Sequence, residues 1–442
     1  MTMYGDLEVS NIDELPNGIA DFNVDNSVDI LDIVSMKKYL AKGNIYTKSG
    51  TLNFGTQEHL YEYDNPLMTE EYIADATATM GANTYRLSYG INSLFAPTRT
   101  NSVTVDQENM AELKSMVAAL KAKGIDNILL VSPYFVLPYN YNASYTQNGM
   151  AHHGTVPNPV TDRENYIAWL EVNAAAYKKL AQEVPEIKFF EPFNEINLTS
   201  ARIEKLGSGW NSTAAVQNSH KFTVAEKAGI MADLCWYISR AVKEVNPANQ
   251  ITTPSISISQ GNSNVQDNFT DELYKAIESG NYPTNKAVSD KIADHYFTIV
   301  NIHCYPNFTN KGEATENSNV NTFASSITEV YATVKAHGDG DSRVWLTETG
   351  MSTMHPDGAD REMANAARIL RKTLEKIDTN LTFIDTVILY KIADMSADYN
   401  GGVNTCEQCY GLFYAVDDGD HPYEAKETAK VVYSFFNNGT TD

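Results

Sequence analysis

Residues 188–197 read KFFEPFNEIN, a short apolar run that ends in two polar residues, Asn194 and Glu195. A second stretch of the same kind, residues 343–350 (RVWLTETG), carries Glu348 near its end. Short apolar runs bounded by turn residues predict buried strands. The two stretches therefore predict two strands of one sheet, each with a glutamate at its carboxyl end.

Six further apolar runs follow the same pattern, so the chain carries eight predicted strands from residue 46 onward. Stretches with helical spacing of apolar residues lie between or after them, as at 106–123, 224–245, 360–376 and 424–436. A doubly wound sheet also alternates strands and helices, but no glycine-rich phosphate loop follows the first strand. We therefore predict an α/β fold, a (β/α)8 TIM barrel with enlarged loops. The predicted strands are 51–55, 84–88, 127–132, 188–193, 251–257, 297–305, 343–347 and 386–392.

Composition narrows the class of partner. The 442-residue chain has a formal net charge of -23 and is 43% hydrophobic. This acidity disfavours nucleic acid, whose phosphates require a basic surface, and favours a neutral substrate such as carbohydrate. No apolar run of about 18 residues occurs, which excludes a membrane-spanning helix. The opening MTMYGDLEVSN has neither a basic leader nor an apolar core. The chain is thus either intracellular or has lost a signal peptide. Of these, we expect the second, a secreted protein. We also expect a monomer.

Residues 21–32 (DFNVDNSVDILD) place oxygen-bearing side chains at the intervals that converge on one calcium ion in a loop. With the amphipathic helix predicted to follow, this segment resembles one repeat of a dockerin module. The resemblance implies a cohesin or scaffoldin partner and a cellulosome-associated location; an acidic, solvated leader is the alternative. We divide the chain into a partial dockerin-like segment, 1–45, and a barrel domain, 46–442. The predicted calcium ligands are Asp21, Asn23, Asp25, Ser27, Asp29 and Asp32.

Polar residues also lie at the ends of other predicted strands, where barrels of this kind carry their reacting groups. Arg86 lies in TYRLSYG of the second strand, His303 and Tyr305 lie in IHCYP of the sixth, and Lys391 lies in the eighth. We predict that these four side chains support or bind a substrate. Trp210, in the long segment after the fourth strand, is a further candidate for substrate binding.

Two glutamates on nearly opposite strands can face each other across the barrel mouth, as glycoside hydrolysis requires. One carboxylate attacks the anomeric carbon, while the other, protonated, assists the leaving oxygen. Arg86 and hydrogen bonds from the sixth strand are expected to keep Glu348 ionised. Poor solvation and a nearby negative charge are expected to keep Glu195 protonated, and Asn194 can donate its amide to a sugar hydroxyl.

This motif set resembles that of glycoside hydrolase clan A over residues 46–437. The resemblance implies a (β/α)8 barrel and, in most families, β-linked substrates. It also implies a retaining mechanism through a covalent glycosyl-enzyme intermediate, with Glu195 as acid/base and Glu348 as nucleophile. Arg86 and Tyr305 match positions that contact the nucleophile. The segment KFFEPFNEINL, followed by a long helix, resembles family 39, whereas the motif set as a whole also fits family 5.

The eighth strand departs from the clan pattern. The clan commonly has a tryptophan there, but this chain has Tyr390 and Lys391. We therefore expect loop aromatics to stack against the sugar instead. The candidates are Trp210, Tyr134, Phe135 and Tyr139.

We thus expect a secreted enzyme that cleaves β-linked plant cell-wall polysaccharide or oligosaccharide. No cofactor is expected for catalysis, and Ca²⁺ is expected only at the N-terminal loop. A catalytically silent barrel that binds glycans or scaffolds other proteins is one alternative, and a metal-dependent hydrolase using His152 and His153 is another. Cys406 and Cys409 form a CEQC pair that fits a small redox site, half a metal site or a local staple. The sugar, the linkage and endo or exo action stay open.

Overall fold

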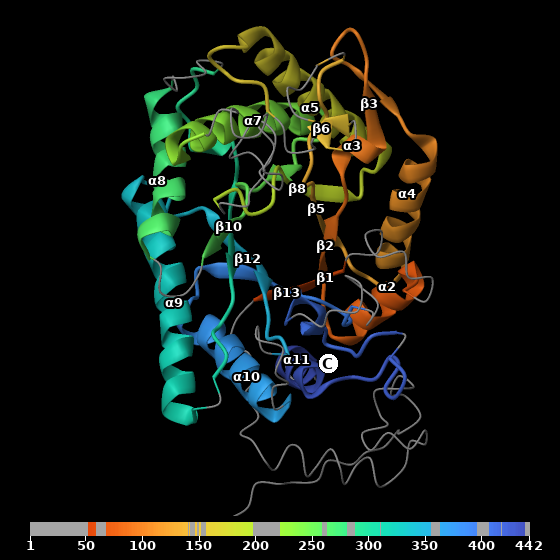
Figure 1. The fold of residues 1–442 in the computed structure, drawn as a ribbon, viewed down its shortest axis with the longest axis vertical. Helices are drawn as coiled ribbons and strands as arrows, with labels where there is room; N and C mark the ends of the chain where they lie inside the picture. Colours follow the sequence, from red (N-terminus) through yellow and green to blue (C-terminus); the bar gives the residue numbers. More distant parts are fainter. Residues whose placement is uncertain are drawn as a thin grey trace, which may run out of the picture.

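A ring of parallel β-strands forms the centre of the computed structural model, and helices surround it (Figure 1). The main sheet has nine strands in the order β10-β11-β12-β13-β1-β2-β5-β8-β9, with parallel pairings throughout. The strands are β1 (Asn53–Glu58), β2 (Thr84–Ser88), β5 (Asn127–Val131), β8 (Ile187–Glu191), β9 (Gln250–Ile251), β10 (Ile256–Ile258), β11 (Ile299–Cys304), β12 (Arg343–Thr349) and β13 (Ile384–Tyr390). The structure describes residues 52–58, 68–139, 141, 146–147, 150–151, 156–197, 222–258, 263–280, 288–309, 311–354, 363–395, 406–416 and 418–437.

The fifth barrel strand is divided into β9 and β10, where the sequence predicts one strand over 251–257. Pro254 lies between the two pieces. Because proline has no backbone N–H to donate, it interrupts the hydrogen-bond ladder there. Thr252 still pairs with Ile299 through a parallel bridge, and the Thr253 N–H donates to the Ile299 carbonyl at 2.8 Å. The sheet therefore closes on itself, which confirms the predicted (β/α)8 barrel.

The helices follow the strands along the chain and pack around the ring. The helix predicted at 224–245 is found with these bounds as α7, because Thr223 and Glu226 form a reciprocal capping box at its start. Figure 1 shows α8, α9 and α10 on one side of the ring and α2 and α4 on another. The helices are α2 (Glu70–Thr79), α3 (Ile91–Leu94), α4 (Gln107–Ala122), α5 (Arg163–Glu183), α7 (Val224–Val245), α8 (Ser263–Ser279), α9 (Glu313–Ala336), α10 (Met363–Asn380) and α11 (Glu427–Asn437).

The buried apolar side chains form two separate clusters. Most buried apolar residues form one large cluster that includes helix and strand residues. A second, small cluster takes one residue from each of five strands: Leu129, Phe189, Ile299, Trp345 and Ile388. Since side chains in a strand point alternately to its two faces, this small cluster is an apolar layer inside the barrel. Polar residues follow this layer on the same strands, toward their carboxyl ends.

The predicted calcium loop, 21–32, and the boundary between 1–45 and 46–442 lie outside the described residues. Their ligands and partner therefore stay predictions. Among the helices that the structure describes, none is both long and apolar enough to cross a membrane.

Candidate active site

Beyond the apolar layer, the inward face of the barrel carries polar side chains. Two residues beyond the layer, toward the carboxyl end, β8 carries Glu191, β11 carries Asn301 and β12 carries Thr347. His303 lies two residues further along β11. All four are fully buried. Buried polar groups must be hydrogen-bonded, so this part of the barrel is a connected network rather than a packed apolar core.

Arg86 on β2 is the centre of that network. Its guanidinium binds Glu191 through two bonds, Nε to Oε2 at 2.8 Å and Nη2 to Oε1 at 2.9 Å. It also donates to Gln57 Oε1 at 2.7 Å, to Asn194 Oδ1 at 2.7 Å and to Glu348 Oε1 at 2.5 Å. Arg86 is 2% exposed and Glu191 is fully buried. The bidentate pair holds the guanidinium in one orientation, so its remaining N–H groups are aimed at the barrel mouth.

A register shift turns Glu348 toward the mouth. On β11 and β12, Ile302 pairs with Leu346, but the next pair is His303 with Glu348. One extra residue, Thr347, is thus accommodated on β12. Strict alternation would send Thr347 inward and Glu348 outward, and such an irregularity re-aims the following side chain. Glu348 therefore shares the mouth with His303 instead of pointing into the helical layer.

The surroundings of Glu348 favour its ionised form. Burial by itself raises the pKa of this carboxyl, but the positive charges of His303 and Arg86 and hydrogen bonds from Tyr305 and Arg86 hold the pKa well below its usual range. The Tyr305 hydroxyl donates to Glu348 Oε2 at 2.9 Å. Burial and the negative charge of Glu348 raise the pKa of Tyr305 itself, so this phenol stays protonated and remains a donor. Glu348 is arranged as a carboxylate nucleophile would be.

His303 lies between the two predicted catalytic carboxyls. Its Nδ1 is 3.2 Å from Glu195 Oε1 and 3.3 Å from Glu348 Oε2. One oxygen of each glutamate and one ring nitrogen all lie within 4.8 Å of one another. The Glu195 side chain is 23% exposed and that of Glu348 12% exposed, so both are reachable from solvent. The structure thus brings together the pair that the sequence predicts.

The other ring nitrogen of His303 is held by a buried chain of hydrogen bonds. Nε2 lies 3.0 Å from Thr347 Oγ1, and the Thr347 hydroxyl donates to Asn301 Oδ1. A hydroxyl has one proton, so the Thr347 oxygen must accept from Nε2–H. Nε2 is therefore the hydrogen-bond donor in this chain, and Nδ1 faces the two carboxyls.

The backbone around Glu195 is bonded to the fifth barrel strand. Glu195 adopts a left-handed φ of 47°, and its N–H donates to Ser255 Oγ at 2.8 Å. The next N–H, of Ile196, donates to the Ser255 carbonyl at 3.1 Å. The Asn197 side chain donates from Nδ2 to the Ser257 carbonyl and accepts the Ser257 N–H at Oδ1, both at 2.8 Å. These bonds over-determine an unusual conformation, which is typical of a functional residue.

The other predicted site residues divide into three groups. Asn194 accepts from Arg86 through Oδ1, which leaves its amide NH₂ as the donating end. Lys391 is 1% exposed and forms a buried ion pair with Glu58 at 2.9 Å, so it supports the barrel rim rather than contacting a substrate. Trp210 lies outside the described residues, as do His152 and His153 of the metal-dependent alternative.

The prediction that Phe135 stacks against a sugar is wrong. It is 2% exposed and packs against Trp169 and Phe193 at ring-centroid distances of 5.0 and 4.9 Å, so no sugar can reach it. Phe135 belongs to the core because it faces α5 rather than the mouth. Tyr134 is half-buried, and Tyr139 is 41% exposed.

Four residues of the polar network were not predicted from the sequence: Glu191, Gln57, Asn301 and Thr347. A signal for Glu191 was present, because a carboxylate inside the apolar run KFFEPF must have a buried cationic partner. Arg86 inside TYRLS has the same requirement. Nothing local identifies Thr347 as the residue accommodated by a register shift. Cys406 and Cys409 begin and end a short 3₁₀ helix, and Cys304 of β11 is buried in the large core cluster.

A closed (β/α)8 barrel with two facing carboxyls, an arginine, a histidine and a tyrosine at its mouth is the arrangement of a glycoside hydrolase. The sequence model of the family described as cellulase (glycosyl hydrolase family 5) matches residues 45–383. The chain belongs to this family, which confirms the clan A resemblance and decides between families 39 and 5. Comparison with curated proteins gave no significant match.

Solved structures share the fold at low sequence identity. The chain is similar to a GH5-4 broad specificity endoglucanase from Clostridium acetobutylicum, with 15% identity, 88% of this chain and 97% of that chain covered, and a TM-score of 0.54. It is similar to a β-glucosidase from Thermotoga maritima (12% identity, coverage 88% and 98%, TM-score 0.56). A family 39 glycoside hydrolase from Bacteroides cellulosilyticus is also similar (15% identity, coverage 87% and 64%, TM-score 0.51).

Proposed function

We propose that this glycoside hydrolase cleaves β-linked plant cell-wall polysaccharide or oligosaccharide with retention of anomeric configuration. The observation that carries the proposal is the approach of the two carboxyls, with one oxygen of Glu195 within 4.8 Å of one of Glu348. Retaining enzymes hold their carboxyls about 5–5.5 Å apart, whereas inverting enzymes need about 6.5–9.5 Å to admit a water between them. The gap here supports direct attack by a carboxylate.

In the first step, an oxygen of Glu348 attacks the anomeric carbon, and the bond from that carbon to the leaving oxygen breaks. The proton of Glu195 moves to the leaving oxygen. Arg86 and Tyr305 hold Glu348 ionised and oriented through contacts of 2.5 and 2.9 Å. The product of this step is a glycosyl ester on Glu348.

In the second step, the Glu195 carboxylate takes a proton from water, and the water oxygen attacks the anomeric carbon. The ester bond to Glu348 breaks, and the sugar leaves with its original configuration. His303 positions Glu195 for both steps through the contact of 3.2 Å between Nδ1 and Glu195 Oε1.

Two observations support a neutral glycan as the substrate. The chain carries a net charge of -23, which repels acidic polymers. The mouth combines carboxyls with hydrogen-bond donors, and Asn194 offers an amide NH₂ next to the reacting pair. The description of the family as cellulase and the endoglucanase and β-glucosidase named among similar structures agree with a β-linked glycan.

The test combines product stereochemistry with one substitution. Proton NMR during hydrolysis of barley β-glucan, xyloglucan, glucomannan and arabinoxylan should show the β-anomer as the first product. Glu348→Gln should lower kcat by about 10⁴-fold or more, because the nucleophile is lost while the shape is kept. A 2-fluoro glycoside should label the peptide that contains Glu348. An α-anomer as first product, or a label on another peptide, would refute double displacement.

A further inference from the structure

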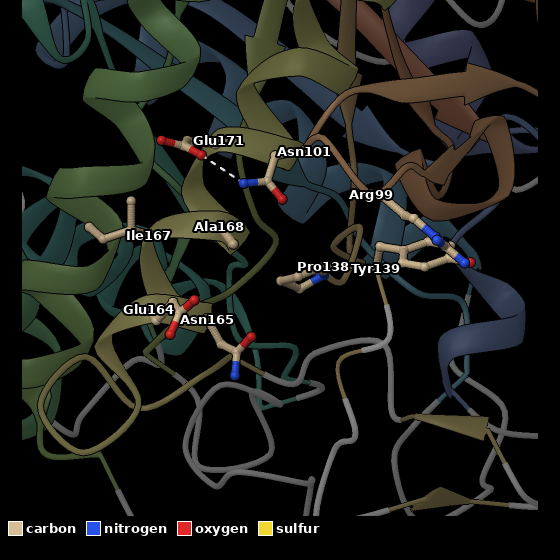
Figure 2. A pocket seen from close by; sticks show the side chains of 9 residues that line it. All are labelled: Arg99, Asn101, Pro138, Tyr139, Glu164, Asn165, Ile167, Ala168 and Glu171. Atoms are coloured by element: carbon tan, nitrogen blue, oxygen red, sulfur yellow. Dashed lines mark hydrogen bonds between the residues drawn. The ribbon is translucent and has the colours of Figure 1, made fainter.

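A second hollow lies beside the barrel mouth, between an antiparallel hairpin and the start of α5. The hairpin consists of β3 (Phe95–Pro97) and β4 (Val103–Val105). The hollow has a volume of about 750 Å³, and Figure 2 shows the side chains that line it. Its polar lining residues are Arg99, Asn101, Tyr139, Glu164, Asn165 and Glu171.

The position of these residues in the chain places the hollow on the active-site face. The hairpin follows the carboxyl end of β2, Tyr139 follows that of β5, and Glu164 and Asn165 lie in the first turn of α5. In a (β/α)8 barrel, segments that follow the strands and begin the helices lie on the face that carries the reacting groups. The hollow therefore opens on the same face as Glu195 and Glu348.

The hollow is held in shape by a contact between its two walls. Asn101, at the turn of the hairpin, adopts a left-handed φ of 53° and donates from Nδ2 to Glu171 Oε2 on α5 at 2.8 Å (Figure 2). Thr98, at the same turn, accepts the N–H of Asn101 and donates its own N–H to Ser102. The hairpin is thus fastened to α5 rather than free at its tip.

One wall presents an aromatic ring covered by a guanidinium. The Cζ of Arg99 lies 5.5 Å from the ring centroid of Tyr139, and 41% of Tyr139 is exposed (Figure 2). A sugar ring has an apolar C–H face that stacks on an aromatic ring and hydroxyl edges that bond planar polar groups. Arg99 offers such a group at the ring, and Asn165, Glu164 and Glu171 offer others elsewhere in the lining of the hollow.

We propose that this hollow is a remote subsite that binds a neutral sugar unit of the polysaccharide, with Tyr139 as the stacking platform. The inference rests on the proposed function, because it assigns the ligand as a distant part of the same substrate. The charges favour a neutral ligand, because the lining holds one arginine, Arg99, and two glutamates, Glu164 and Glu171. That balance repels phosphorylated or acidic ligands.

The experiment measures affinity for polymer in native gels that contain barley β-glucan, xyloglucan, glucomannan or arabinoxylan. The parent chain carries Glu348→Gln so that the polymer is not cut. Tyr139→Ala should weaken retardation about two- to tenfold, the effect of losing one stacking contact. Tyr139→Phe should keep the parent affinity because it keeps the ring. Arg99→Ala provides a second, independent variant of the same wall.

Trp236→Ala is the matched control. Trp236 is also covered by an arginine, with Arg240 Cζ 4.5 Å from its ring centroid, but it lies on α7 in a shallow hollow on the outer helices. Its loss should leave retardation unchanged. Equal retardation of Tyr139→Ala and the parent, or no retardation of the parent by any polymer, overturns the subsite. Failure of the proposed function would look different: the unmodified chain would hydrolyse none of the polymers in the NMR assay.

Discussion

The Thr347 hydroxyl lies 3.0 Å from Nε2 of His303, the ring nitrogen opposite the one that faces Glu195 and Glu348. This contact orients the imidazole, with Nε2 as the donor to the Thr347 oxygen. Nδ1 in turn is within 3.3 Å of both Glu195 and Glu348. A fully buried residue, Thr347, thereby orients the imidazole that lies between the two carboxyls.

Replacing Thr347 by valine tests that relation. The change keeps the shape but leaves the buried Nε2–H of His303 without an acceptor. We expect kcat to fall about tenfold, because the imidazole loses the hydrogen bond that orients it between the two carboxyls. Thr347→Ser should restore kcat. A lower melting temperature with an unchanged kcat would mean that Thr347 is only a packing residue.

Tyr305→Phe tests how Glu348 is kept ionised. The variant removes the 2.9 Å bond from the phenol to Glu348 Oε2. That bond is one of the causes that lower the pKa of Glu348, so its loss should raise the pKa. The acidic limb of kcat/KM should therefore move to higher pH, by about one unit for one charge-assisted hydrogen bond. The alkaline limb should stay, and an acidic limb that does not move would contradict the assignment.

Asp233 on α7 allows a stability prediction away from the active site. Burial raises the pKa of this carboxyl to about 8, although a hydrogen bond from Tyr166 and the charge of Arg163 oppose the rise. The folded state thus holds a proton that the unfolded chain releases above about pH 4, so stability falls between about pH 4 and pH 8. Asp233→Asn should gain thermal stability over the unmodified chain across that window.

Differential scanning calorimetry at several pH values checks this expectation. Asparagine keeps an oxygen that can accept from the Tyr166 hydroxyl, which is 2.8 Å from Asp233 Oδ2. Asp126→Asn, at a side chain that is 72% exposed, is the control and should show no such trend. A difference for Asp233→Asn that is independent of pH would show that its carboxyl is ionised in the folded protein.

Calcium should bind the loop at 21–32 without affecting hydrolysis. The reason for the second part is the guanidinium of Arg86, 2.5 Å from Glu348, which disfavours another cation between the carboxyls. Calorimetric titration with calcium should give one binding event that Asp21→Ala abolishes. A chelator should leave the hydrolytic rate unchanged. Absence of calcium binding would remove the basis of the dockerin-like segment, and loss of hydrolysis would favour a metal-dependent reaction.

Period-two alternation explains how much the sequence could predict about the site. Once eight strands are recognised, the inward positions of KFFEPF and TYRLS follow, and so do the buried charges Glu191 and Arg86. Alternation fails at β12, where the register shift reverses the direction of Glu348. The strand count predicts that Glu348 is at the rim, but only the neighbouring strand shows how it turns inward.

The sequence by itself determined the barrel, because each strand and helix is encoded by the spacing of apolar residues within a short window. It also determined the two glutamates, because they end strands that such a barrel brings to one face. Only the tertiary structure decided the partners. Arg86 and Glu348 are 262 positions apart, and His303 reaches Thr347 across 44. Contacts of this kind depend on ring closure and register, and no local pattern in the chain encodes either one.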